Sequence, residues 1–226
     1  MRTDELIDSL VVDMGPTPRG EPERKLALVA AGGALIALAL VLAWLKLRPD
    51  LGEAVGRPFI WIKAGYTALL AVGAFLACER LARPGVSSAR AWAAFGAVVA
   101  VFAGLALFEL IGLDPAGRIA ALRGGSWQVC SRNIALLGAP TTLIALAVLR
   151  GFAPTRPGLA GFACGAFSGA VAATVYGLHC PEATFAFVAV WYTLGVLGCA
   201  ALGAVLGRWM LRWRDLAPSA LGSDPG

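Results

Sequence analysis

The sequence is poor in charge and has almost no histidine for its length. Only 15% of its 226 residues are charged, and His179 is the single histidine. A soluble domain would carry about 25% charged residues. The stretches outside the apolar runs are short, which leaves no room for a soluble catalytic core, so we expect no enzyme. The net charge of +5 comes mainly from residues at the ends of apolar runs. It therefore does not indicate direct binding of nucleic acid.

Long apolar runs take the place of charge. Hydrophobic residues make up 58% of the chain, and an apolar helix of about 20 residues spans a bilayer. We predict an all-α integral membrane protein, a bundle of six transmembrane helices, with a transmembrane domain over 26–207. A cytoplasmic N-terminal segment (1–25) precedes it and a cytoplasmic C-terminal tail (208–226) follows. The six predicted spans are residues 26–45, 59–78, 91–111, 133–149, 159–178 and 183–206.

The distribution of Lys and Arg predicts the orientation of the spans. With both termini in the cytoplasm, twelve basic residues lie in the inner segments and six in the outer loops. Cytoplasmic segments are normally the richer in Lys and Arg, so we expect both termini inside. The first run is too long for the apolar part of a signal peptide, and we expect it to remain in the mature protein. The longest loop, 112–132, is then outside and contains a predicted short helix over 118–122.

The N-terminal segment differs from the rest of the chain because it is acidic and amphipathic. Thr3 suits a helix N-cap, and apolar residues follow at helical spacing. A helix on the membrane surface would normally be basic, and a tail without a partner would not need an apolar face. Apolar anchors with flanking acids favour binding in the groove of a protein partner. The candidate contact residues are Asp4, Glu5, Leu6, Ile7, Asp8, Leu10 and Val11.

The five cysteines divide into two groups. Cys78, Cys164 and Cys199 lie within apolar runs, where a thiol behaves as a small hydrophobic group. Cys130 and Cys180 instead fall at the edges of two outer loops. In the favoured orientation both face the same oxidising compartment. They fit a redox-responsive or metal-responsive pair, a static disulfide, or two unrelated thiols.

Other polar residues lie near this pair along the chain. His179 precedes Cys180, Glu182 follows it closely, and Glu109 lies near the end of the third span. Thiolate and imidazole suit soft metals, so His179, Glu182 and Glu109 are weaker candidates as ligands of a transient metal ion at Cys130 and Cys180. A capping or interfacial role fits His179 better. We expect no obligatory cofactor.

Two further patterns have a structural and a functional interpretation. Lys63 and Glu109 are charged residues near the ends of the second and third predicted spans. Charges in such positions either have a functional role or pair with each other. Gly161, Gly165 and Gly169 recur every four residues, a spacing that allows close helix packing in lipid. We expect these glycines to serve the bundle, although a homo-oligomer remains open.

The sequence combines the N-terminal string 2–10, the six spans, and two motifs, Trp-Gln-Val-Cys at 127–130 and His-Cys-Pro-Glu at 179–182. In this combination the chain resembles the NrsF-type integral-membrane anti-sigma factors. The resemblance covers essentially the whole chain. It implies that the protein holds an extracytoplasmic-function sigma factor at the bacterial inner membrane. Release would follow heavy-metal or oxidative stress, sensed by Cys130 and Cys180 on the periplasmic side.

Two alternative functions stay open. A small transporter or exporter of a metal would need polar residues along the bundle interior, and few are present. A membrane thiol oxidoreductase typically uses two cysteine pairs, whereas the sequence shows one outward pair and no Cys-x-x-Cys motif.

Overall fold

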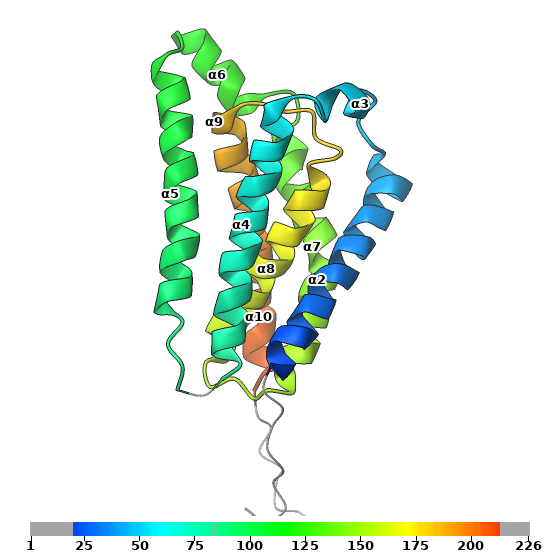
Figure 1. Cartoon of the computed structure of the whole chain (residues 1–226), viewed down its shortest axis with the longest axis vertical. Coiled ribbons are helices and arrows are strands. Elements are labelled where there is room, and N and C mark those ends of the chain that lie inside the picture. The colour runs from blue at the N-terminus through cyan, green and yellow to red at the C-terminus, as the bar shows by residue number, and fades with distance from the viewer. Residues whose placement is uncertain (1–19, 84, 213–226) are drawn as a thin grey trace, which may run out of the picture.

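The computed structural model describes residues 20–83 and 85–212, and this part of the chain is helical without a β-strand (Figure 1). The predicted N-terminal helix lies outside the described residues. Two segments are π-helical: η1 (Val41–Leu45) continues α2, and η2 (Val188–Tyr192) leads into α10. The α-helices are α2 (Glu21–Leu40), α3 (Leu51–Ala54), α4 (Pro58–Leu81), α5 (Ala89–Ile111), α6 (Pro115–Arg123), α7 (Trp127–Arg150), α8 (Pro157–Tyr176), α9 (Phe185–Phe187) and α10 (Thr193–Met210).

Six helical segments are long and apolar enough to cross a membrane, as predicted. Their ends differ from the predicted ends by a few residues, except for the fourth. α7 begins at Trp127 rather than at 133, because Gln128, Ser131 and Arg132 lower the hydropathy of its first two turns. Cys130 therefore lies in that first turn and not in the loop edge where hydropathy alone places it. The short helix expected over 118–122 is α6.

Local chemistry accounts for several helix boundaries. Pro58, Pro115 and Pro157 occupy the first positions of α4, α6 and α8, where the missing N–H has no helical partner to lose. The carboxylate of Asp114 accepts a hydrogen bond from the Gly117 N–H at 3.0 Å and caps α6. α7 continues through Pro140.

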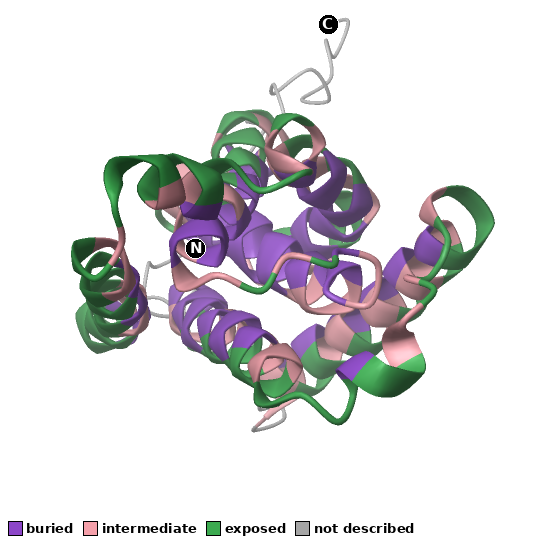
Figure 2. Ribbon diagram, turned by 90° about the horizontal axis from the view of Figure 1, so that it is seen from above, coloured by how far each residue is buried: buried purple, intermediate pink, exposed green. Residues whose placement is uncertain are grey.

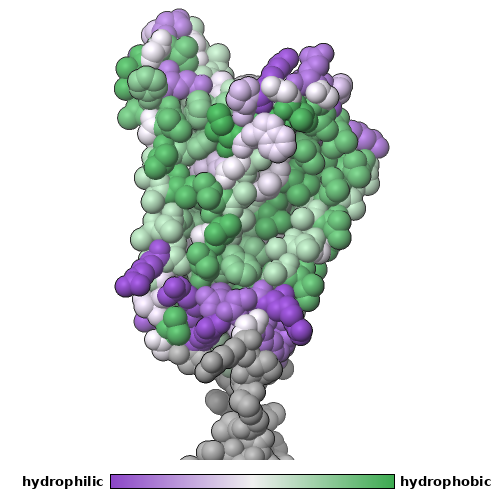
Figure 3. All heavy atoms as spheres, in the orientation of Figure 1, coloured by the Kyte–Doolittle hydropathy of each residue, from purple (hydrophilic) through white to green (hydrophobic). Residues whose placement is uncertain are grey.

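The molecular surface has an apolar belt between two polar ends (Figure 3). At one end the described chain begins and stops, and α4 turns into α5 and α7 into α8 (Figure 1). We call this the tail end. The opposite end carries α3, α6 and the turn between α8 and α9, and we call it the thiol end. The apolar belt suits a lipid environment. Because the described chain passes six times between the two ends of the molecule, it begins and stops at the same end.

The buried residues gather in the interior of the bundle (Figure 2). This core centres on α8, which packs against α10, α4, α7 and α2. α8 and α10 meet at their glycines: a Cβ on Gly165 would overlap the carbonyl oxygen of Cys199, and one on Gly203 would overlap that of Gly161. The predicted packing role of the four-residue glycine spacing is confirmed. Close backbone approach is what small residues allow between helices.

Candidate functional site

Cys130 and Cys180 meet at the thiol end although 49 residues separate them along the chain. Cys130 lies in the first turn of α7, and Cys180 lies just after α8, where its N–H donates to the carbonyl of Tyr176. Both are fully buried free thiols. Their sulfurs are close enough for one thiol to hydrogen-bond the other. The fold therefore brings together the two cysteines that the sequence singled out.

The surroundings of Cys180 favour its thiolate form. A hydrogen bond from the Cys130 thiol is the largest influence, and the nearby ammonium of Lys63 adds to it. Together they outweigh the desolvation of the thiolate and hold the pKa of Cys180 below its usual range. Hydrogen bonds to a charged form and nearby opposite charges both favour ionisation. Because the thiolate is the reactive form of cysteine, Cys180 is the thiol that this site prepares to act as a nucleophile.

Lys63 is buried against the turn that carries Cys180. Its side chain is 2% exposed, and its Nζ donates to the carbonyl oxygens of Cys180 at 2.9 Å and Glu182 at 3.2 Å. The ammonium also lies 5.6 Å from the centre of the Tyr192 ring. The alternative that Lys63 pairs with Glu109 is wrong. Within the described residues, Lys63 has no carboxylate within salt-bridge distance, so backbone carbonyls and an aromatic face solvate it.

A second cation reaches the same turn from the segment after α2. The backbone N–H of Arg48 donates to the Leu178 carbonyl at 3.2 Å, and its Nη1 lies 3.5 Å from the Cys180 carbonyl. Its guanidinium also forms two 2.7 Å hydrogen bonds with Asp50, which lower the pKa of that exposed carboxylate to about 2. A cavity of about 40 Å³ lies between Arg48, Lys63 and Glu182.

Glu182 joins the turn to the start of α7. Its Oε1 accepts hydrogen bonds from the Gly125 N–H at 2.8 Å and the Ser126 hydroxyl at 3.1 Å. Gly124 has a φ of 52°, and a Cβ there would overlap the Glu182 carboxylate. The Ser126 hydroxyl also lies 3.9 Å from the Cys180 sulfur. Thus Glu182 stabilises the approach of the two elements that carry the thiols.

The two remaining weaker ligand candidates contact backbone groups. Glu109 accepts a hydrogen bond from the Ala186 N–H at 2.8 Å, which ties α5 to the start of α9. His179 Nδ1 lies 2.8 Å from the carbonyl oxygen of Lys46, a residue with a φ of 68°. His179 therefore has the capping role that the sequence favoured. Across residues 20–83 and 85–212, no three or more His, Cys, Asp or Glu side chains gather as a metal-binding group.

The structure also shows a thiol contact that the sequence does not predict. Cys78 of α4 and Cys164 of α8 are both fully buried, with their sulfurs 4.0 Å apart. The Cys199 sulfur lies 3.6 Å from the Ala135 carbonyl of α7. These three thiols lie in the packed helix interior, where the expected role as small hydrophobic groups fits. Spacing along the chain carries no signal for the 78–164 contact, which depends on how α4 and α8 pack.

Comparison with known proteins identifies the family. The family model described as negative regulator of sigma F (NrsF) matches residues 10–213. The chain belongs to the NrsF family. The anti-sigma-F factor NrsF of Caulobacter vibrioides is 51% identical over 214 residues, which cover 94% of this chain and all of that protein.

A second NrsF relative covers nearly the same length. The probable anti-sigma-F factor NrsF of Azospira oryzae is 42% identical over 213 residues, again 94% of this chain and all of that protein. No solved structure matches this chain. Membership in NrsF confirms the resemblance drawn from the N-terminal string and the two cysteine motifs. It places the chain in a family described as regulatory rather than catalytic.

Proposed function

We propose that this chain is a membrane-bound anti-sigma factor of the bacterial inner membrane. It holds an extracytoplasmic-function sigma factor at its cytoplasmic tail end and releases it when Cys130 and Cys180 react on the periplasmic side. Family membership supports the regulatory role. The excess of basic residues in the tail-end segments supports the orientation.

The meeting of Cys130 and Cys180 carries the sensing part of this proposal. Cys130 belongs to α7, and Cys180 belongs to the turn that follows α8. Lys63 connects that turn to a third element, α4. A reaction that joins the sulfurs changes the distance between them, and the surrounding contacts must adjust. Packed cores switch between discrete arrangements rather than deforming continuously. The thiol pair is therefore suited to favour one of two bundle arrangements.

Oxidation by a peroxide is one stimulus that fits the site. The Cys180 thiolate attacks a peroxide oxygen, the O–O bond breaks, and the alcohol or water leaves with a proton. The resulting sulfenic acid condenses with the Cys130 thiol, which forms the disulfide and releases water. Two electrons pass from the two sulfurs to the peroxide. The thiolate character of Cys180 suits the attacking thiol, and the adjacent Cys130 suits the thiol that resolves the sulfenic acid.

A soft heavy-metal ion is the other stimulus. Thiolates bind such ions well, and binding by both sulfurs would displace the proton of the Cys130 thiol, since Cys180 is already held as a thiolate. The ion would hold the sulfurs at a separation set by its own coordination bonds, so it too would change the contact between α7 and the turn. Neither stimulus requires a resident cofactor.

The glycine contact between α8 and α10 offers a route to the opposite end. α8 ends four residues before Cys180, and both helices run from the thiol end to the tail end (Figure 1). Backbones packed in direct contact move together. We infer that a shift of the turn at Cys180 reaches the cytoplasmic ends of α8 and α10, and that it lowers the affinity for the sigma factor. A stimulus acts only through such a difference in affinity between two states.

The N-terminal segment is the proposed sigma-factor contact. Leu6, Ile7, Leu10 and Val11 would enter an apolar groove of the sigma factor, and Asp4, Glu5 and Asp8 would meet its basic rim. The spacing of these residues supports the assignment. So does the chain connectivity, since the segment joins the described chain at the tail end.

Co-purification of the full-length protein with the sigma factor tests the proposal. We expect wild type to capture it and Leu6→Ala/Leu10→Ala to lose about tenfold or more of the affinity, because buried apolar anchors carry most of the energy of such a contact. Thr17→Ala is the matched control in the same N-terminal stretch and should capture normally. Peroxide or a soft metal ion should release the sigma factor from wild type but not from Cys130→Ser/Cys180→Ser.

Each contrary result has a definite meaning. Capture that survives the double leucine substitution would move the contact to the cytoplasmic loops. A normal response in the cysteine double variant would place the switch elsewhere. If the protein captures no sigma factor under any condition, and cells that contain it export metal, the anti-sigma-factor proposal would give way to the transporter alternative.

A further inference from the structure

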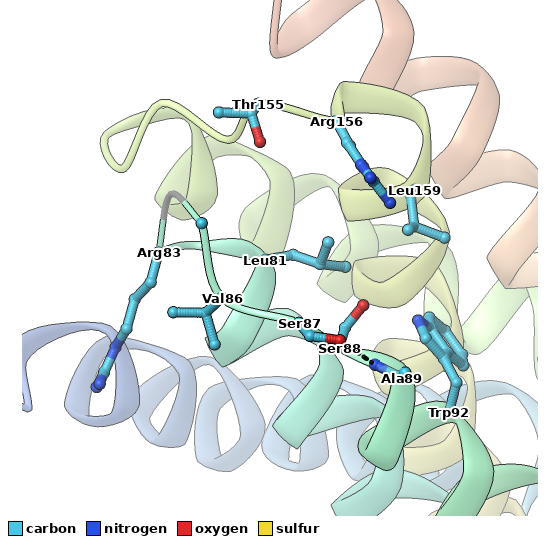
Figure 4. Close-up of a pocket in the computed structure, with 11 residues that line it drawn as sticks. Leu81, Arg83, Val86, Ser87, Ser88, Ala89, Trp92, Thr155, Arg156 and Leu159 are labelled. Atoms are coloured by element: carbon cyan, nitrogen blue, oxygen red, sulfur yellow. Dashed lines mark hydrogen bonds between the residues drawn. The ribbon is translucent and has the colours of Figure 1, made fainter.

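A pocket at the tail end is complementary to the acidic N-terminal segment of the same chain. It has a volume of about 500 Å³ and lies between the α4–α5 connection and the start of α8 (Figure 4). Apolar side chains and hydrogen-bond donors share its wall. Its lining includes Arg83, Ser88, Trp92, Thr155, Arg156 and Leu159.

The polar groups of this pocket are suited to an anionic or carbonyl-rich occupant. Arg156 is exposed, and no carboxylate in the described part of the chain lies within salt-bridge distance of it. The indole N–H of Trp92 is buried and has no hydrogen-bond acceptor among the described residues. A buried donor without a partner is costly, so native structures rarely leave one unused. Both groups are donors only.

The apolar part of the wall comes from Leu81, Val86, Trp92 and Leu159. An occupant that fits this pocket therefore combines apolar side chains with acids. Residues 1–14 have that composition, with four acids, one arginine and the apolar residues Leu6, Ile7, Leu10 and Val11. The C-terminal segment fits less well, because residues 213–226 contain two acids and one arginine.

The N-terminal segment also joins the described chain next to the pocket. Arg83, which lines it, pairs with Glu23 in the first turn of α2. Nineteen residues precede Gly20, and each extended residue spans about 3.3–3.6 Å. Residues 15–20, when fully extended, therefore span about 20 Å from the start of α2, which begins beside the pocket. A tether this short gives an effective concentration on the order of millimolar, which favours the chain's own segment over a free protein of similar chemistry.

We propose that residues 1–14 dock in this pocket when no sigma factor is bound, and that the pocket and the sigma factor compete for the same segment. The competition rests on the proposed function, whereas the docking does not. Docking hides Leu6 and Leu10 from the sigma factor, so a bundle arrangement that opens or tightens the pocket changes the affinity without altering the segment itself.

Cross-linking of paired cysteines in the full-length protein tests the docking. Ser9→Cys/Thr155→Cys places one thiol on the segment and one on the pocket rim without altering an apolar anchor, and a short bis-maleimide joins them in the absence of sigma factor. Ser9→Cys/Val55→Cys is the matched control, since Val55 is exposed at the thiol end. We expect an intramolecular product from the first pair only, with the linked residues located by peptide mass spectrometry.

Charge reversal shows whether the charge of Arg156 holds the N-terminal segment in the pocket. Arg156→Glu should reduce the cross-link yield about threefold to fivefold, and Asp8→Arg in the same chain should restore it, because an exposed ion pair is worth a factor of that size. Equal yields in both pairs, or a yield insensitive to Arg156→Glu, would overturn the docking. Products only between two chains would assign the pocket to a second copy and overturn it as well.

The sigma factor itself separates this inference from the proposed function. Purified sigma factor should lower the cross-link yield in the wild-type background and should bind Arg156→Glu more tightly. A cross-link that forms only in the presence of sigma factor would assign the pocket to the complex and overturn the docking. A cross-link that forms normally but ignores bound sigma factor would uphold the docking and reject residues 1–14 as the sigma-factor contact.

Discussion

α8 and α5 are both apolar helices of similar length, yet they relate to the bundle in opposite ways. In their spanning windows 72% of α8 is buried and only 17% of α5. α8 packs on four helices, whereas α5 packs mainly on α4 and α9 (Figure 1). Hydropathy does not explain the difference, since α5 has the higher value. In a bilayer, an apolar surface is equally satisfied by lipid or by protein, so close packing depends on shape.

The positions of the glycines show this difference in shape. Gly161, Gly165 and Gly169 of α8 face the backbone of α10, whereas a Cβ added to Gly96 or Gly104 of α5 would meet no neighbouring atom within 4 Å. The helix that leads into the thiol turn is the one packed on all sides. At the thiol end α5 is held by the Glu109 hydrogen bond and by a small apolar cluster of Ala106 with Ala186.

The largest expected effect is on the α8–α10 contact. Gly165→Leu should prevent normal folding, because even a Cβ at this position overlaps the Cys199 carbonyl, and forced overpacking costs about 1–3 kcal/mol or more. Gly104→Leu on α5 is the matched control and should leave the protein unchanged. Monomer yield by size exclusion and the melting temperature in detergent measure both. Similar melting temperatures for Gly165→Leu and Gly104→Leu would show that α8 is not packed more closely than α5.

Lys63→Met should have the next largest effect. It leaves the Glu182 carbonyl without its buried donor and the Cys180 carbonyl with only the 3.5 Å contact to Arg48, and an unsatisfied buried group costs about 1–3 kcal/mol. It also removes the positive charge that helps to hold the pKa of Cys180 low. The midpoint of Cys180 alkylation against pH should therefore rise by about one unit.

Measuring the alkylation rate in a Cys130→Ser background, with and without Lys63→Met, isolates the charge effect at Cys180. The serine removes the neighbouring thiol from both proteins, so the difference between them reports on the ammonium alone. An unchanged midpoint would leave Lys63 only a structural role.

Glu109→Ala should loosen α5 without disturbing α8. The Ala186 N–H loses its carboxylate acceptor, a loss comparable to removing a helix cap, about 1 kcal/mol. Glu109→Gln keeps an acceptor oxygen and should recover much of the stability. Hydrogen exchange should rise at residues 185–187 and not along α8. Faster exchange along α8 would show that α5 contributes to the central packing.

The smallest effect concerns the half-buried Arg48–Asp50 pair. The pKa of Asp50 falls to about 2 in the folded protein, below about 3.9 in the unfolded chain. The pair therefore stabilises the fold above the unfolded value, and this contribution disappears as the pH falls through about 2. Asp50→Asn should lower the melting temperature slightly at pH 7 and not at about pH 2. A constant difference across this range would assign the effect to something other than ionisation.

Hydropathy and residue type predict much of this protein from the sequence. The six helices, the packing role of Gly161, Gly165 and Gly169, the capping by His179 and the NrsF resemblance all come from local pattern. These features lie within one chain segment each, where a helix period, a run length or a motif is visible. The beginning of α7 escapes this kind of prediction because Gln128, Ser131 and Arg132 interrupt its apolar run.

Tertiary structure decided what depends on residues far apart in the chain. It brought Cys130 to Cys180 and set Cys78 against Cys164. It also gave Lys63 two backbone carbonyls, where pairing with Glu109 was one of the alternatives, and formed the pocket at Arg156. By itself, the sequence determined which segments are helical and apolar, since these are properties of consecutive residues. Only the packing decided which side chains meet, because in an apolar environment helix partners are chosen by surface shape and a few buried polar contacts.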